Sequence, residues 1–115
     1  MKTLYHVMKP NGTMTNYTAE LAEEPGYGAL KALIEPYLNG GHLEHVTVLW
    51  NEEGPPWERL DMFVDEDGHN KGLPRNERAT QIYRNNWFTQ NKNAKPEDLP
   101  HIVGPAILFA LRVWF

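Results

Sequence analysis

Residues 71–80, KGLPRNERAT, place basic and hydrogen-bonding side chains at the start of a predicted helix. Pro74 is a residue type favoured in the first turn of a helix, and Lys71, Arg75 and Arg78 surround it. The first N–H groups of a helix have no partner within the helix, and they carry the positive end of its dipole. Phosphate groups bind at such helix starts, and arginine can hold them with two parallel hydrogen bonds. The pattern therefore predicts a binding site for a phosphate-bearing anion.

The predicted ligand-binding residues lie on this helix or just before it, and all of them can donate hydrogen bonds. They are Lys71, Arg75, Asn76, Arg78, Thr80 and Arg84. The alternative interpretation is a solvated helix face, whose arginines pair with the carboxylates just upstream. Those carboxylates are Asp61, Asp65, Glu66 and Asp67. Further along the helix, Tyr83, Trp87 and Phe88 could stack on a base, although Tyr83 and Trp87 also fit a buried stripe.

Charge is distributed unevenly along the chain, whose formal net charge is −4. Residues 1–68 hold four basic and twelve acidic side chains, whereas residues 69–95 hold six basic side chains against Glu77. Such asymmetry indicates which kind of partner each segment attracts. The basic segment suits an anion, and the acidic segment suits a basic protein.

The sequence lacks the residue patterns of the common catalytic and metal sites. It has no cysteine and no serine, so it can form neither a disulfide nor a cysteine or serine nucleophile. The Walker motif and the G-x-G-x-x-G motif are absent. Residues 65–70, DEDGHN, begin like a calcium-binding loop, but Asn70 stands where that loop needs glycine. We therefore predict no catalytic residue, no bound metal and no cofactor, and we favour a non-enzymatic protein.

Hydrophobic periodicity and turn residues divide the chain into strands and helices. Strands are expected over residues 2–9, 13–21, 43–50, 59–65 and 102–113, and helices over residues 27–38 and 74–88. Asn11-Gly12 favours a tight turn between the first two strands. Pro36 and the following Asn39-Gly40-Gly41 predict the end of the first helix.

The order ββ-α-ββ-α-β predicts an α+β fold formed by a single domain, residues 1–115. Because short connections join the strand pairs, we expect a five-stranded, mainly antiparallel sheet with two helices packed on one face. A hydrophobic content of 41% in 115 residues is enough for a packed core.

The C-terminal strand carries the features from which we predict a homo-oligomer. Gly104-Pro105 interrupts this strand, which is typical of a sheet edge, and edge strands can pair between subunits. The final Trp114-Phe115 would either cap the core or form an association patch. No stretch has the pattern of a membrane span or a signal peptide, so we expect a cytoplasmic protein without membrane contact.

Three segments resemble a family of small proteins encoded by phages, plasmids and bacteria, which is known as a domain of unknown function. Residues 72–80 match its helix start, G-L-P-x-N-x-x-A-T, and residues 102–106 match its strand pattern I-V-G-x-A. Residues 40–46, G-G-x-L-E-x-V, are similar to the family's G-G-x-I-E-x-V run. The resemblance implies a mobile-element setting, and the host cell cytosol if the protein is phage-encoded. It implies no particular activity.

From the residues and this setting we expect an accessory protein of a phage or mobile element. It would bind a phosphorylated or nucleotide-like small anion at the start of the second helix, and so sequester a host signalling nucleotide as a counter-defence. Two alternatives stay open. The acidic first half, with Glu52, Glu53 and Glu58, would inhibit a basic host protein. Residues 71–95 would bind nucleic acid, which the net charge of −4 disfavours.

Overall fold

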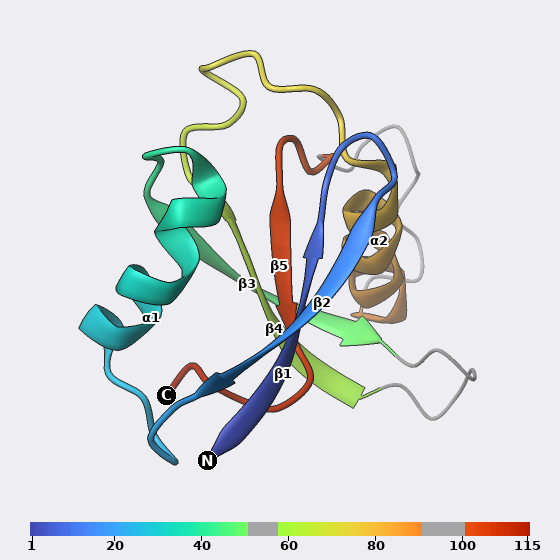
Figure 1. The fold of residues 1–115 in the computed structure, drawn as a ribbon. Helices are drawn as coiled ribbons and strands as arrows, with labels where there is room; N and C mark the ends of the chain where they lie inside the picture. Colours follow the sequence, from blue (N-terminus) through green and yellow to red (C-terminus); the bar gives the residue numbers. More distant parts are fainter. Residues whose placement is uncertain (51–57, 91–100) are drawn as a thin grey trace.

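A computed structural model describes residues 1–50, 58–90 and 101–115, and for residues 86–90 the backbone alone (Figure 1). The strands are β1 (Lys2–Met8), β2 (Met14–Glu20), β3 (Leu43–Trp50), β4 (Glu58–Asp65) and β5 (Ala106–Phe109). The helices are α1 (Tyr27–Ile34), which the 3₁₀ turn η1 (Glu35–Leu38) extends, and α2 (Glu77–Gln90). The predicted order of elements is confirmed. No helix in these ranges is long and apolar enough to cross a membrane.

The five strands form one sheet in the order β2-β1-β5-β4-β3, and each neighbouring pair is antiparallel. The hairpin β1–β2 and the hairpin β3–β4 form its two halves. β5, the last strand along the chain, inserts between them, where it pairs Phe109 with Tyr5 and Ile107 with Phe63. The predicted α+β class and the five-stranded antiparallel sheet are confirmed.

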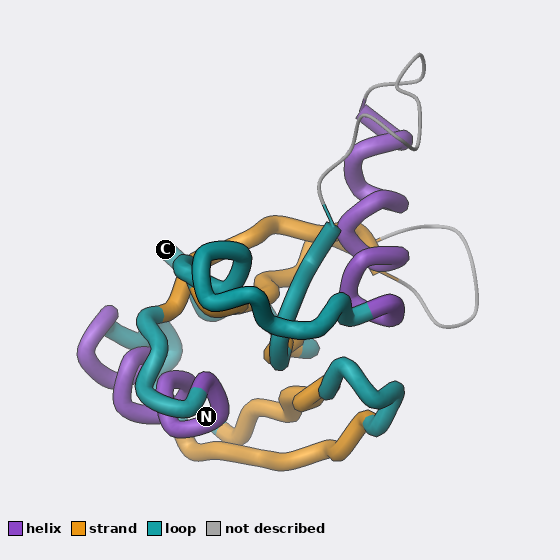
Figure 2. Tube along the Cα trace, turned by 90° about the horizontal axis from the view of Figure 1, so that it is seen from above, coloured by secondary structure: helices purple, strands orange, loops and turns teal. Residues whose placement is uncertain are grey.

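The two helices cover opposite faces of the sheet (Figure 1). On one face, α1 and η1 contribute Leu30, Ile34 and Leu38 to a core that includes Tyr5 and Phe63. On the other face, α2 packs over a second core. Figure 2 shows the same separation of the two helices from above. The expectation that both helices pack on one face is therefore wrong.

The reason is that the central strands are apolar on both sides. Met62 joins Ala79 and Ile82 of α2 in the second core, whereas the adjacent Phe63 joins the core under α1. Successive side chains of a strand point to opposite faces, so a strand with consecutive apolar residues needs cover on both faces. All four residues of β5 are buried in this way.

β5 lies in the middle of the sheet, so the prediction of an edge strand from Gly104-Pro105 is wrong. Both residues precede the strand, which begins at Ala106, and the proline therefore removes no hydrogen bond from the ladder. The last two residues, Trp114 and Phe115, lie in different environments. Trp114 stacks on His45 with ring centroids 4.7 Å apart, whereas Phe115 is 59% exposed.

The second helix begins later than predicted, at Glu77 instead of near Pro74. The residues before it are extended and pair with the segment before β5. Arg75 forms a β-bridge with Val103, and the N–H of Gly104 donates to the carbonyl of Pro74 at 2.8 Å. This short pairing decides where the predicted ligand-binding residues lie.

Candidate functional site

Two of the predicted ligand-binding residues, Asn76 and Thr80, are buried and anchor α2. Asn76 is 0% exposed, and its Nδ2 donates to the carbonyl oxygens of Met8 and Gly104, both at 2.9 Å. Oγ1 of Thr80 accepts a hydrogen bond from the N–H of Ile102 at 2.9 Å. These bonds tie α2 to the end of β1 and to the segment before β5. Both amide donors of Asn76 are used inside the protein, so it has none left for a ligand.

Asn76 also caps the start of α2. Its Oδ1 accepts from the N–H of Ala79 at 3.1 Å, and its carbonyl accepts from the N–H of Thr80 at 2.9 Å. A capping side chain satisfies one of the free N–H groups to which an anion would otherwise bind, and here that group is the N–H of Ala79. At this N–H the chain itself takes the place that an anion would have.

The two cations that precede α2 have carboxylate partners. Lys71 Nζ lies 2.7 Å from Oδ2 of Asp65, whose side chain is 1% exposed. Arg75 Nε lies 2.7 Å from Oε1 of Glu77, and both of these side chains are exposed. An exposed ion pair contributes at most about 1 kcal/mol, whereas breaking a pair with a buried carboxylate leaves that charge uncompensated. Lys71 is therefore held by the protein more firmly than Arg75.

Arg78 and Arg84 form no ion pair with any residue that the structure describes. Arg78 is exposed, and its nearest polar contact is a weak one, 4.0 Å from Nη1 to Sδ of Met14. The Nε of Arg84 is enclosed without a hydrogen-bond partner. Their spacing on a helix with 3.6 residues per turn places them on different sides of α2. The predicted residues therefore do not converge on one point.

Asp61, a predicted partner of these arginines, makes its contacts on the other face of the sheet. Its Oδ1 lies 2.7 Å from Nε2 of His45, and its Oδ2 accepts from the N–H groups of Val113 at 2.8 Å and Trp114 at 2.9 Å. Together these donors satisfy the buried carboxylate and hold the C-terminal segment against the sheet. Asp61 and Asp65 therefore have separate partners, Asp61 in His45 and the C-terminal segment and Asp65 in Lys71.

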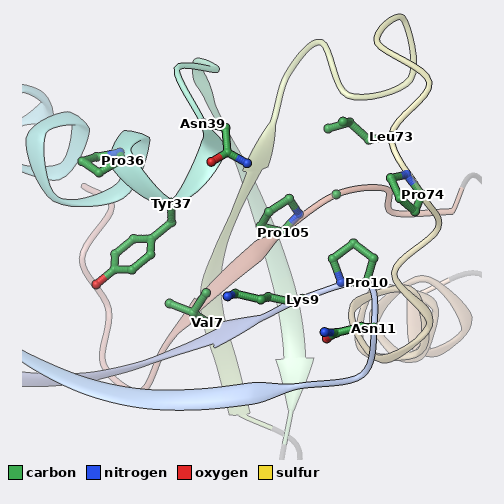
Figure 3. Close-up of a pocket in the computed structure, with 11 residues that line it drawn as sticks. Val7, Lys9, Pro10, Asn11, Pro36, Tyr37, Asn39, Leu73, Pro74 and Pro105 are labelled. Carbon is green, nitrogen blue, oxygen red and sulfur yellow. The ribbon is translucent and has the colours of Figure 1, made fainter.

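Beside the anchored segment lies a cavity of about 710 Å³, the proline-lined cavity (Figure 3). Four parts of the chain surround it: the turn after β1, η1, the residues before α2 and the residues before β5. Each part contributes one proline to the lining, namely Pro10, Pro36, Pro74 and Pro105. Proline fixes its own backbone angle and has no N–H, so these walls are stiff and apolar. The volume lies within the range of small-molecule pockets.

The motifs singled out in the sequence build one wall of this cavity. Leu73 and Pro74 lie next to Gly104 and Pro105 in this wall, where the N–H of Gly104 donates to the carbonyl of Pro74 at 2.8 Å. Gly104 adopts a φ of 73°, and a Cβ at that position would lie 2.7 Å from Cδ1 of Leu73. Only glycine therefore lets Leu73 approach the backbone this closely. The buried Asn76 also holds the segment before α2 to the segment before β5, because its Nδ2 donates to the carbonyl of Gly104.

The polar groups of the lining favour an anion. Lys9 lies among the lining residues in Figure 3, and it has no ion-pair partner within the described ranges 1–50, 58–90 and 101–115. The amides of Asn11 and Asn39 also line the cavity, and none of the described lining residues is a carboxylate or an imidazole. Lys9 is exposed, so its charge is open to a ligand that enters from the solvent.

Tyr37 contributes an aromatic ring to the lining, and other tyrosines hold that ring in place. Its hydroxyl is hydrogen-bonded to the hydroxyl of Tyr5 at 2.8 Å, and its ring centroid lies 5.6 Å from that of Tyr17. Burial, together with the hydrogen bond between the hydroxyls of Tyr5 and Tyr37, raises the pKa of Tyr5 above the usual range of tyrosine. Tyr5 therefore stays a neutral hydroxyl that can keep Tyr37 in position.

Sequence reasoning missed the cavity because its lining comes from segments that are far apart in the chain. No local motif marks Lys9 or Tyr37. A signal was present in the four prolines, each of which either follows, begins or interrupts a predicted element. It could not be interpreted without knowing that β5 inserts next to β1, since that insertion brings the segments together.

Within the described parts of the chain, no group of three or more histidine, cysteine, aspartate or glutamate residues could hold a metal ion. The chain matches no protein-family model, no curated protein and no solved structure. The function must therefore be inferred from the geometry and charge of the cavity itself.

Proposed function

We propose that this protein is a small-molecule binding protein that holds a nucleotide-like anion in the proline-lined cavity. The observation that carries this proposal is Lys9, which lines a cavity of about 710 Å³ whose described lining residues include no carboxylate. The ligand class is the one expected from the sequence. The site is different: it lies beside the start of α2, because Asn76 caps the helix start itself.

The lining matches the parts of such a ligand. The prolines and Leu73 offer apolar contact to a base or sugar, and Tyr37 offers an aromatic ring for stacking. Lys9 supplies the positive charge that a phosphate needs. Asn11 uses its Oδ1 to accept from the N–H of Thr13 at 2.9 Å, so its Nδ2 is the group that a ligand would meet.

Binding without chemical conversion fits this lining better than catalysis does. In the part of the chain that the structure describes, no carboxylate or imidazole lines the cavity, so these residues offer no acid–base pair of the usual kind. In the cytosol of a host cell, a phage or mobile-element protein with this site would sequester a signalling nucleotide. The protein would act by lowering the free concentration of that nucleotide.

The two alternative functions remain predictions, and no specific observation favours them. Glu52 and Glu53 lie outside the described residues, and Glu58 is exposed at the start of β4. Residues 91–95 of the proposed nucleic-acid segment also lie outside the described residues. The arginines of α2 that are described point to different sides of the helix.

The proposal is tested by isothermal titration calorimetry with adenosine 5′-monophosphate and with adenosine as probes. We expect the monophosphate to bind more tightly than adenosine, because only the monophosphate can pair with Lys9. Loss of a charge-assisted hydrogen bond costs about 1.5–3 kcal/mol, so Lys9→Ala should weaken binding by roughly 10- to 100-fold. Lys2→Ala is the matched control, because Lys2 is an exposed lysine at the other end of β1 and should leave the affinity unchanged.

Two further variants separate this site from the one predicted at the helix start. Arg75→Ala and Arg78→Ala should each change the affinity less than about threefold, since neither residue lines the cavity. If these two variants abolish binding while Lys9→Ala does not, the site is at the start of α2 and the cavity proposal is wrong. If a titration with guanosine 5′-monophosphate, run in the same way, and the titration with adenosine 5′-monophosphate both show no binding, the nucleotide-like ligand class is wrong.

A further inference from the structure

β2 is an edge strand of the sheet, and among the described residues β1 is its sole strand partner (Figure 1). The hydrogen bonds at the two ends of the β1–β2 hairpin show which backbone groups of β2 point away from β1. The N–H of Lys9 donates to the carbonyl of Thr13, and the N–H of Leu21 donates to the carbonyl of Met1. Hydrogen-bonded pairs alternate along an antiparallel ladder, so the backbone groups of Asn16 and Thr18 point away from β1. Such outward groups can pair with another strand.

This edge lacks the devices that usually prevent strands from pairing. Its sequence, MTNYTAE, contains no lysine, arginine or proline. The register with β1 runs without interruption from Lys2↔Glu20 to Met8↔Met14, so no bulge twists the edge away. The other edge strand, β3, is bordered by α2, which packs against it. β2 is therefore the edge of the sheet that is open to a partner.

The sequence of β2 is complementary to itself in the antiparallel direction. A twofold axis at Tyr17 would place Asn16 opposite Thr18 of the second copy, so that outward-pointing backbone groups meet each other. The same register places Glu20 opposite Met14, which keeps the two copies of Glu20 apart. Threonine and tyrosine are residues that favour strand pairing. The edge therefore fits a second copy of the same chain without a like-charge contact.

Apolar groups on both faces lie beside the open edge. Tyr17 is 40% exposed and stacks on Tyr5, which belongs to the core under α1. Leu4 is also 40% exposed, and it lies opposite Thr18 on the other face of the sheet. A strand added next to β2 would cover part of the Tyr17 side chain, which belongs to the edge strand itself. Exposed apolar residues that flank an open edge are typical of a surface that associates.

We propose that the protein forms a symmetric dimer in which the β2 strands of two copies pair antiparallel about Tyr17, so that the two sheets become continuous. This proposal does not depend on the cavity or on its ligand. It also differs from the self-association predicted from the sequence, which used the strand at Gly104-Pro105, because that strand is central in the sheet.

The test combines the molar mass in solution with amide hydrogen exchange on the wild-type chain. We expect multi-angle light scattering to give twice the mass of the chain at high protein concentration, and a lower mass on dilution. The amides of Asn16 and Thr18 should be protected from exchange in the dimer and lose protection on dilution. The amides of Thr15 and Tyr17 are the internal control, because their hydrogen bonds to β1 protect them at every concentration.

Two variants assign the interface to β2. Thr18→Pro removes an outward N–H and is tolerated where that group faces solvent, so it should give the mass of a single chain. Thr18→Lys is the second variant, for the case that the proline variant does not fold. It adds a charge to the edge and should also give the mass of a single chain. A wild-type mass of a single chain at all concentrations overturns the proposal. A dimer in which both folded variants keep the doubled mass, or in which Asn16 and Thr18 exchange freely, overturns it as well.

Discussion

Asn76 hydrogen-bonds to three separate parts of the protein: the end of β1, the segment before β5 and the first turn of α2. Asn76→Ala would leave buried carbonyl groups without donors and would remove the cap of α2. We expect it to lower the free energy of unfolding by about 2–4 kcal/mol, measured by urea denaturation. Arg78→Ala is the control, because Arg78 is exposed and should change stability by less than about 0.5 kcal/mol. Equal effects of the two substitutions would contradict the anchoring role of Asn76.

Tyr5 should give the protein a dependence of stability on alkaline pH. Its pKa is raised in the folded protein, chiefly by burial and then by the hydrogen bond with Tyr37, whereas an unfolded tyrosine has a pKa of about 10. Above pH about 10 the unfolded chain therefore loses this proton while the folded protein keeps it, and the free energy of unfolding falls. Below that pH the contribution of Tyr5 is fully present.

The measurement is the melting temperature of the wild type and of Tyr5→Phe from neutral to alkaline pH. The variant loses the hydrogen bond to Tyr37, so we expect it to be less stable by about 1 kcal/mol at neutral pH. Its melting temperature should then fall less steeply than that of the wild type above pH about 10. Parallel curves for the two proteins would show that Tyr5 ionises in the folded protein as readily as in the unfolded chain.

At the scale of elements, the segments before α2 and before β5 must stay close together for the cavity to exist. Gly104→Ala would force a Cβ to within 2.7 Å of Leu73 Cδ1 at a φ of 73°. We expect a loss of about 1–3 kcal/mol in the free energy of unfolding, together with weaker ligand binding, because the wall of the cavity has to shift.

The matched control is Gly28→Ala in α1, where φ is not positive and a Cβ would meet nothing within 4 Å. This substitution should stabilise the protein by about 0.5–1 kcal/mol, since alanine favours a helix more than glycine does. Both values come from the same chemical denaturation experiment. If Gly104→Ala were as mild as Gly28→Ala, the close approach of Leu73 would not matter to the fold.

The elements were largely predictable from local patterns, and their ends were less so. The two hairpins follow from apolar runs separated by turn residues. The start of α2 was placed near Pro74, because proline is favoured in a first turn, but Asn76 is the actual cap. A proline also fits an extended segment, and the pairing of Arg75 with Val103 selects that alternative. This pairing joins distant residues, so no local pattern could reveal it.

For the whole molecule, the class of fold was predictable and the arrangement of its layers was not. The consecutive apolar residues Met62-Phe63-Val64 were a signal that β4 is covered on both faces. Their meaning depends on β4 lying inside the sheet, which follows from the insertion of β5 between the two hairpins. The same insertion brings the prolines of the cavity together. Sequence patterns describe residues that are neighbours along the chain, whereas the cavity and the two cores depend on contacts between distant segments that the strand order brings together.

The predicted ligand-binding site also depends on contacts between residues that local sequence patterns do not reveal. The sequence correctly identified where basic residues gather, but it could not show which of them are already paired. Lys71 is held by the buried Asp65, and Arg75 is paired with Glu77. Lys9 belongs to the acidic half of the chain, so its charge gave no local signal. The structure places it in the cavity without a partner among the described residues.

The most direct test of the central claim is to observe where adenosine 5′-monophosphate binds on the wild-type protein, by nuclear magnetic resonance of its backbone amides. We predict chemical-shift changes that saturate with the ligand at residues around the proline-lined cavity. These are the residues after β1, at Tyr37 and Asn39, and around Gly104. Shifts confined to Glu77, Arg78 and Ala79 at the start of α2, with no change around Lys9, would contradict the account.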